Sequence, residues 1–133
     1  MTKIGKLCLF SSSPRRLIIL QNFCQNIEQF KIPFEEPIPR RGQNPRFFLR
    51  KCVDAKFSQV EKWFQSQKST FQRSRRGQYF LVADTMVSKG ARLLGKPQDR
   101  SEAKSMLLRL SGQWHSVFTG FRLGCFGGQE TNG

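Results

Sequence analysis

The sequence predicts a single α/β domain in which a mixed central sheet is flanked by helices. Short apolar runs typical of strands alternate along the chain with segments of helical periodicity. One strand is followed by a tight turn and a second apolar run, which predicts an antiparallel hairpin in the sheet. With 133 residues, the chain is long enough for one hydrophobic core but not for two.

The N-terminal segment predicts a strand, a helix and a loop. Ile4–Phe10 is short and largely apolar, as expected of a buried strand. Ser13 suits the N-cap of a helix and Pro14 its first position. Apolar residues then recur at helical spacing, which extends this helix to about Ile27: Leu17, Leu20, Cys24 and Ile27. Lys31–Phe34 is predicted as a second short strand, and the proline-rich residues 35–45 as an irregular loop.

A second helix is predicted from about Arg46 to Phe64. At 100° steps, one arc collects nearly all its apolar residues and one lysine: Leu49, Cys52, Val53, Lys56, Phe57, Val60, Trp63 and Phe64. Lys56 lies near the middle of this arc. Either its side chain reaches out to solvent, or its ammonium meets an anion, because an unpaired buried ammonium is too costly.

The second half of the chain begins with a basic linker over Lys68–Gln78. Tyr79–Val87 is the strongest strand signal, and residues 88–90 turn the chain toward Leu93 and Leu94. Asp99 and Glu102 have capping-box spacing for a helix that ends at Gly112. Residues 113–123 return as a strand. The domain is therefore expected to span residues 1–123, with an unstructured tail over 124–133.

Charge and cysteines narrow the classes of function. The net charge is +14, and residues 40–76 hold eleven Lys and Arg against Asp54 and Glu61, which implies an anionic partner or a basic face that serves solubility. Neither a signal peptide nor a membrane span is visible. The four cysteines show no Cys-x-x-Cys spacing, and His115 is the single histidine, which disfavours a zinc site. Buried reduced thiols in the cytoplasm are expected.

The stretch "FSSSPRR" predicts an anion site. It places Ser11, Ser12 and Ser13 between a strand and a helix N-terminus, and Arg15 and Arg16 can donate to phosphate oxygens. A plain N-cap or a phosphorylation target would also account for these residues. The glycines and lysine of a Walker loop are missing.

Two carboxylates and a lysine are further candidates. Asp84 lies inside an apolar strand, which favours a functional carboxylate. Glu36 lies on the loop after Phe34, and together the two carboxylates could bind Mg²⁺, which bridges phosphates. Lys96, between Gly95 and Pro97, forms a simple turn or directs an ammonium at phosphate.

Five blocks of sequence, in this order, resemble the Maf family of nucleotide pyrophosphatases: "FSSSPRR", "FEE" before a proline-rich loop, "NPRFFLRKCVDAKF", "VADTMV" and "LLGKPQDRSEAKSMLLRLSGQWHSVFTG". The resemblance covers about Ile4 to Leu123. It implies a Maf/inosine triphosphatase-like fold. It also implies hydrolysis of a nucleoside triphosphate between the α and β phosphates with Mg²⁺ or Mn²⁺. "ADT" and "LSGQWH" are closest to the branch that acts on dTTP and UTP.

The resemblance also implies roles for single residues. Asp84 would be the proton acceptor that activates water, and with Glu36 it would bind the metal. The other matched positions would bind or select the substrate: Ser11, Arg15, Arg16, Glu36, Lys56, Thr85 and Lys96. The family continues beyond this point with a glutamine-bearing motif that nothing here matches, which indicates a truncated member. A basic nucleic-acid-binding module and an inactive truncated protein stay open as alternative functions. A homodimer stays open as the assembly.

Overall fold

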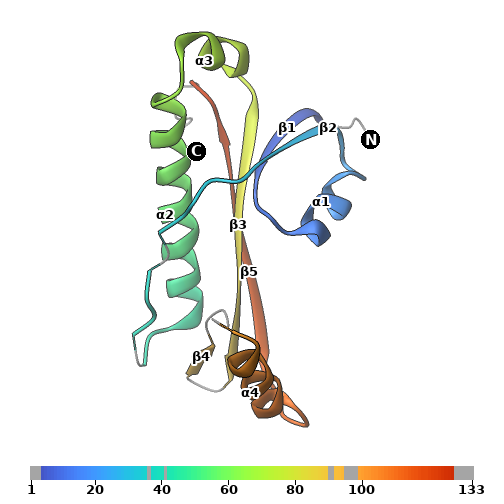
Figure 1. Cartoon of the computed structure of the whole chain (residues 1–133), viewed down its shortest axis with the longest axis vertical. Helices are drawn as coiled ribbons and strands as arrows, with labels where there is room; N and C mark the ends of the chain where they lie inside the picture. The colour runs from blue at the N-terminus through green and yellow to red at the C-terminus, as the bar shows by residue number, and fades with distance from the viewer. Residues whose placement is uncertain (1–3, 36, 41, 90–91, 95–98, 128–133) are drawn as a thin grey trace.

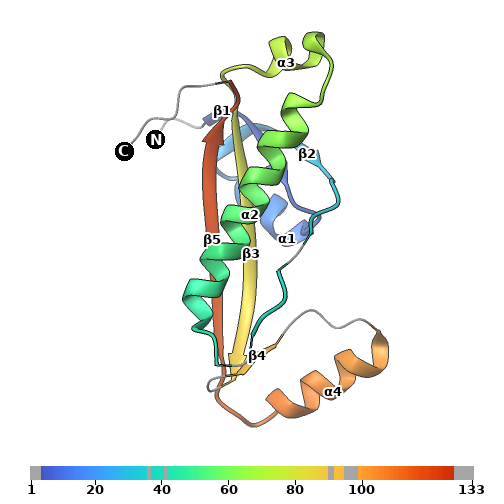
Figure 2. The ribbon, with the colours of Figure 1, turned by 90° about the vertical axis from the view of Figure 1, so that its left-hand side faces the viewer.

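The computed structural model describes residues 4–35, 37–40, 42–89, 92–94 and 99–127. Strands and helices alternate, as Figure 1 shows, in the order β1 Ile4–Phe10, α1 Pro14–Leu20, β2 Cys24–Phe30, α2 Pro45–Gln65, α3 Ser69–Arg75, β3 Tyr79–Lys89, β4 Arg92–Leu94, α4 Arg100–Leu110 and β5 Ser116–Cys125. Figure 2, turned by 90°, shows α2 lying along one face of β3 and β5. Within the described part, no helix is both long and apolar enough to cross a membrane.

The five strands form one mixed sheet, as the sequence predicts. β1 pairs in parallel with β2 and β3, whereas β3 pairs antiparallel with β4 and β5. Parallel pairing of β1 with its two neighbours is typical of an α/β domain, and the β3–β4 pair is the predicted hairpin.

One edge of β3 has a gap. β5 pairs with β3 from Tyr79 to Ser88, so β1 and β4 must both lie along the other edge. On that edge the register with β1 ends at Val82, and the register with β4 begins at Val87. Ala83–Met86 therefore has no strand partner there among the described residues. The functional candidates of β3, Asp84 and Thr85, fall in this gap.

α2 and the N-terminal half of β3 enclose the core. The buried face of α2 agrees with the predicted arc, including Lys56, except that Phe48 is buried and Trp63 is only half-buried: Phe48, Leu49, Cys52, Val53, Lys56, Phe57, Val60 and Phe64. Aromatic rings fill the space between helix and sheet. Phe80 lies 5.0 Å from Phe57 and 4.6 Å from Phe126, measured between ring centroids, and Phe126 stacks on Phe64 at 4.3 Å.

Two glycines of β5 let α2 approach the sheet. A Cβ at Gly124 would lie 2.5 Å from the Phe80 ring and 2.6 Å from the Phe57 ring. A Cβ at Gly120 would lie 3.2 Å from side-chain atoms of both Leu49 and Val53. Any other residue at Gly124 would thus push these rings aside.

Two predicted elements are wrong. The first helix ends at Leu20, where the Asn22 side-chain amide donates to the carbonyl oxygens of Ile18 and Ile19, and residues 24–30 form β2 instead. Pairing with β1 outweighs the helical spacing of Cys24 and Ile27. Residues 31–34 are irregular, because the second strand has already ended at Phe30.

The remaining differences lie later in the chain. The predicted linker contains α3, which packs Phe71 against the aromatic core at a ring distance of 5.6 Å from Trp63. The predicted strand over residues 113–123 begins and ends too early, whereas the domain bounds stay a prediction. β5 runs to Cys125, and Phe126 is buried because it completes the ring stack. Residues 128–133 of the expected tail lie outside the described residues.

Candidate functional site

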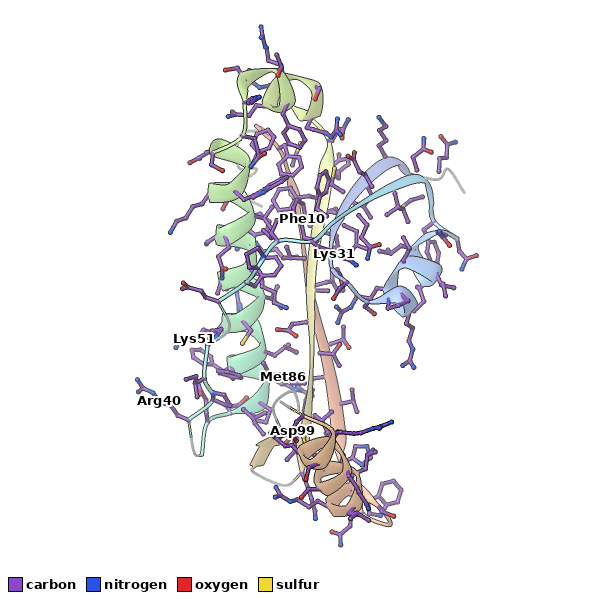
Figure 3. The ribbon with its side chains drawn as sticks, viewed as in Figure 1. Phe10, Lys31, Arg40, Lys51, Met86 and Asp99 are labelled. Carbon is purple, nitrogen blue, oxygen red and sulfur yellow. The ribbon has the colours of Figure 1, made fainter. Side chains whose placement is uncertain are left out.

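A cavity of about 440 Å³ opens at the gap in the edge of β3. Its volume lies within the range of small-molecule sites. The residues that line it come from the end of β1 and its serine loop, from the segment after β2, from α2 and from β3: Phe10, Ser11, Ser12, Ser13, Arg16, Phe30, Lys31, Ile32, Phe34, Lys56, Ala83, Asp84 and Thr85. Figure 3 shows the place of Phe10 and Lys31 between α2 and α1.

The serine loop folds as the sequence predicts. Ser13 is the N-cap of α1, and its hydroxyl accepts a hydrogen bond from the backbone N–H of Arg16 at 3.4 Å. The Ser11 hydroxyl accepts one from the N–H of Ser13 at 3.1 Å. From β2, the side-chain amide of Gln29 donates to the carbonyl oxygen of Ser11. Hydrogen bonds from the start of α1 and from β2 thus hold the serine loop in place.

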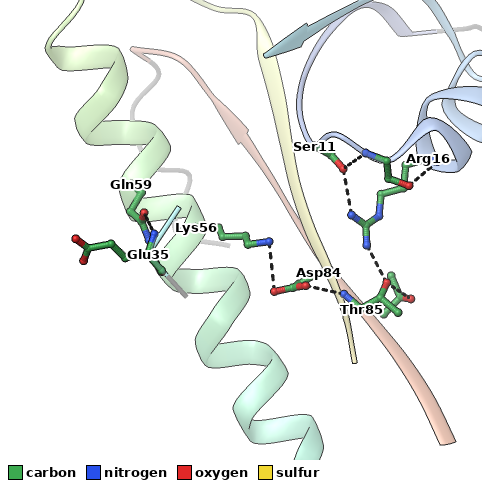
Figure 4. A network of polar contacts seen from close by, with 9 residues as sticks. Ser11, Arg16, Glu35, Lys56, Gln59, Asp84 and Thr85 are labelled. Atoms are coloured by element: carbon green, nitrogen blue, oxygen red, sulfur yellow. Dashed lines mark hydrogen bonds and ion pairs between the residues drawn. The ribbon is translucent and has the colours of Figure 1, made fainter. Parts of the chain in front are cut away.

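Arg16 spans the mouth of the gap. Its Nη1 donates to the Ser11 hydroxyl at 3.2 Å, and its Nη2 donates to the Thr85 hydroxyl at 2.8 Å (Figure 4). The Thr85 hydroxyl lies 3.0 Å from that of Thr119 on β5. A guanidinium carries five N–H donors, and these two bonds use two of them.

Asp84 and Lys56 form an ion pair across the opposite side of the cavity. Lys56 Nζ lies 3.4 Å from Asp84 Oδ2, and each side chain is about 10% exposed. Asp84 Oδ1 accepts the backbone N–H of Thr85 at 2.9 Å. Lys56 Nζ also lies 5.3 Å from the centre of the Phe34 ring. Of the two interpretations of this lysine, the structure supports the one in which a buried ammonium meets an anion.

The segment after β2 closes the cavity and is held by α2. The side chain of Gln59 accepts the N–H of Glu35 at 2.9 Å and donates to its carbonyl oxygen at 3.1 Å (Figure 4). These two hydrogen bonds fix the backbone next to Phe34. Lys31, on the same segment, brings a further ammonium to the cavity that the sequence did not single out. Only its place at the start of the predicted second strand could have indicated it.

The cavity gathers five of the eight predicted site residues: Ser11, Arg16, Lys56, Asp84 and Thr85. Arg15 is exposed and does not line the cavity, because neighbouring residues of a helix point about 100° apart and Arg16 takes the inward direction. Glu36 and Lys96 lie outside the described residues. No sequence signal indicates Thr119, which reaches the site only through strand pairing.

The described residues supply only some of the ligands that a metal ion needs. They contain no group of three or more His, Cys, Asp or Glu side chains that could hold a metal ion. Asp84 is the single carboxylate among the described lining residues. That donor set fits Mg²⁺, which is usually held by one or two carboxylates together with phosphate oxygens.

The thiols are separate from this site. Cys8, Cys24 and Cys52 are buried thiols that form no disulfide, as predicted, whereas Cys125 is exposed. Burial raises the pKa of the Cys8 thiol to about 11, with nearby Glu28 adding to the rise. Burial also raises the pKa of Cys24. Protonated thiols are weak nucleophiles, so neither is suited to covalent chemistry at neutral pH. His115 is exposed and does not line the cavity.

Comparison with known proteins places the chain in a family. A family profile described as "Maf-like protein" matches residues 6–132. A dTTP/UTP pyrophosphatase of Thermomicrobium roseum is 35% identical over 118 residues, which cover 88% of this chain and 49% of that protein. One from Rhizobium meliloti is 37% identical over 125 residues, covering 92% and 57%. One from Nitratidesulfovibrio vulgaris is 34% identical over 126 residues, covering 90% and 51%.

The chain thus spans about half the length of these curated relatives. The match to the family nevertheless runs through nearly all of this chain and includes every described residue that lines the cavity. With its mixed sheet and flanking helices, the chain belongs to the Maf-like protein family.

Proposed function

We propose that this chain hydrolyses a nucleoside triphosphate to the monophosphate and pyrophosphate, with dTTP or UTP as substrate. The observation that carries the proposal is the convergence of Asp84 with Arg16 and Lys56 on one cavity. Three relatives that carry the name dTTP/UTP pyrophosphatase support the choice of substrate. Because the chain spans about half of their length, activity, substrate and partners are proposals here.

Charge neutralisation is the main task of such a site. The triphosphate brings several negative charges, and phosphoryl transfer depends on positioning and electrostatic stabilisation more than on covalent help. Arg16 and Lys56 would contact phosphate oxygens, and Lys31 lies at the same cavity. The hydroxyls of Ser11 and Ser12 would add neutral donors.

Asp84 would act as the general base. A phosphate oxygen that enters the cavity competes with Asp84 for the ammonium of Lys56, 3.4 Å away, and frees a carboxylate oxygen for water. The carboxylate takes a proton from that water as the oxygen attacks the α phosphorus. The bond from this phosphorus to the bridging oxygen then breaks, and pyrophosphate leaves with the electron pair.

A divalent cation, Mg²⁺ or Mn²⁺, would be held by Asp84 and, as the family resemblance implies, by Glu36. When bound, it would supply further positive charge to the phosphates. Arg15, Glu36 and Lys96 keep the substrate-binding roles that the family resemblance implies only as predictions. Cytoplasmic localisation and a homodimer likewise remain predictions.

The apolar side of the cavity would accept the base. Phe30, Ile32 and Phe34 line it on the segment after β2. Aromatic faces stack on any base. Discrimination would therefore come from polar groups such as Thr85, which the family resemblance ties to substrate choice.

The test is the release of pyrophosphate from dTTP and UTP by the purified chain with Mg²⁺ or Mn²⁺. Asp84→Asn keeps the shape but removes the base, so the rate should fall by at least about a hundredfold. Asp54→Asn is the matched control, because Asp54 pairs with Arg122 at 3.2 Å and does not line the cavity. Equal rates for wild type and Asp84→Asn would refute the proposal.

The nucleic-acid alternative is the weaker one, since the relatives' names point to nucleotides. It predicts retention on duplex DNA that falls steeply with salt, whereas a pyrophosphatase alone does not. An inactive chain that also lacks a cooperative unfolding transition would favour the remaining alternative, a family member without function.

A further inference from the structure

A chain of hydroxyl groups links the central strands to Arg16. Thr119 on β5 lies opposite Thr85 in the strand register, and their hydroxyl oxygens are 3.0 Å apart. Thr85 in turn accepts from Arg16 Nη2 at 2.8 Å. Thr119 lines the separate depression between α2 and β5 and does not line the cavity. It therefore acts on the cavity only through Thr85.

The hydroxyl of Thr85 depends on this neighbour for its direction. A threonine hydroxyl has one proton and two acceptor positions, and Arg16 occupies one acceptor position. Thr119 either takes the Thr85 proton or donates to its second lone pair; both arrangements hold the oxygen toward Arg16. Thr85 is exposed, so packing alone does not fix its rotamer. Chains of hydrogen bonds also strengthen one another.

The direction of Arg16 follows from two anchors. Ser11 holds Nη1 at 3.2 Å from the loop after β1, and Thr85 holds Nη2 from β3. Described residues take two of the five N–H donors, which leaves the others to oxygens of a ligand. Loss of one of these two hydrogen bonds would let the guanidinium rotate about the other. A guanidinium that is not held in the binding orientation binds phosphate more weakly.

We propose that Thr119 is a positioning residue: through Thr85 it holds the Arg16 guanidinium in the orientation that binds the phosphate groups of the substrate. This inference rests on the proposed function, because it assumes that Arg16 meets phosphate. An ordinary cross-strand threonine pair would stabilise the sheet alone. The positioning role predicts an effect on ligand affinity that a sheet-stabilising role would not produce.

Two substitutions separate these roles. Thr119→Val has nearly the same shape, suits a strand and lacks the hydroxyl. Thr119→Ser keeps the hydroxyl. Thr70→Val, on the exposed surface of α3, is the matched control. The readouts are KM and kcat for dTTP, the Kd for inorganic tripolyphosphate by calorimetry, and the urea midpoint of unfolding.

With Thr119→Val we expect the Kd for tripolyphosphate and the KM for dTTP to rise about three- to tenfold, the loss of one hydrogen bond. The value of kcat should change less than about twofold, and Thr119→Ser should restore both constants. Unchanged constants in Thr119→Val, or equal losses in both variants, would overturn the inference. A wild-type chain that binds and hydrolyses while Thr119→Val matches it refutes only this inference. A wild-type chain that neither binds tripolyphosphate nor hydrolyses dTTP refutes the proposed function as well.

Discussion

The two ends of the molecule differ sharply in how their side chains pack. At the end near α3, aromatic rings from β1, α2, β3 and the residue after β5 form one cluster, and Phe10, Phe80 and Phe126 are at most 2% exposed. At the other end, α4 has no buried residue, and Leu107 and Leu108 are each almost 70% exposed. β3 runs through both ends (Figure 1). Asp84 lies on β3 between them, so the site has a rigid support on one side only.

The largest effect should come from the aromatic end. Phe126→Ala removes a ring that stacks on both Phe64 and Phe80, and we expect it to lower the free energy of unfolding by about 3–5 kcal/mol. Leu108→Ala at the exposed end should change it by less than about 0.5 kcal/mol. Urea denaturation of both variants measures the contrast. Similar losses would mean that α4 is packed in solution and that the two ends are alike.

The next effect lies at the border between the ends, in the Lys56–Asp84 pair. Removal of either charge breaks the ion pair while the other charge stays buried, so Lys56→Met and Asp84→Asn should each destabilise the fold by about 1–3 kcal/mol. The double variant should lose at least about 1 kcal/mol less than the sum. Losses that add within about 0.5 kcal/mol would show that the two groups do not interact. The region around Lys56 and Asp84 would then be as loosely packed as the exposed end.

A smaller effect on stability concerns Cys8, which lies on β1 in the core of the aromatic end. The folded pKa of about 11 exceeds the usual value of 9.0, so the folded state holds this proton more tightly than the unfolded state. The thiol therefore contributes stability below pH 9 that is lost as pH rises toward 11. The gap in urea midpoint between wild type and Cys8→Ala should narrow over this range. A constant gap would contradict the burial of this thiol.

Sequence patterns predicted the long periodic elements better than the short ones. α2 agrees within one residue at each end, since its apolar arc repeats over 21 residues and leaves no alternative period. β2 was missed because Cys24 and Ile27 fit a helix equally well, and only pairing with β1 decides between the two. The seven residues of α3 carry too few apolar positions to show a period.

The site was predictable where chemistry alone marks a residue. A carboxylate in an apolar strand and a lysine on an apolar helix face stand out, and Asp84 and Lys56 do meet. Adjacent residues such as Arg15 and Arg16 cannot be told apart by type, since only the direction of α1 decides which one faces β3. Thr119 could not be found at all, because its contact with Thr85 depends on the register of β5.

The absence of side chains at Gly120 and Gly124 also affects the distance between Lys56 and Asp84. These positions fix the spacing between the α2 layer and the sheet, and the lysine side chain has a fixed reach. A methyl group at Gly124 would wedge the layers apart and lengthen the separation of Lys56 from Asp84, although neither residue touches that position in the strand register. Selection for an ion pair of the right length would therefore act on two residues that carry no functional group.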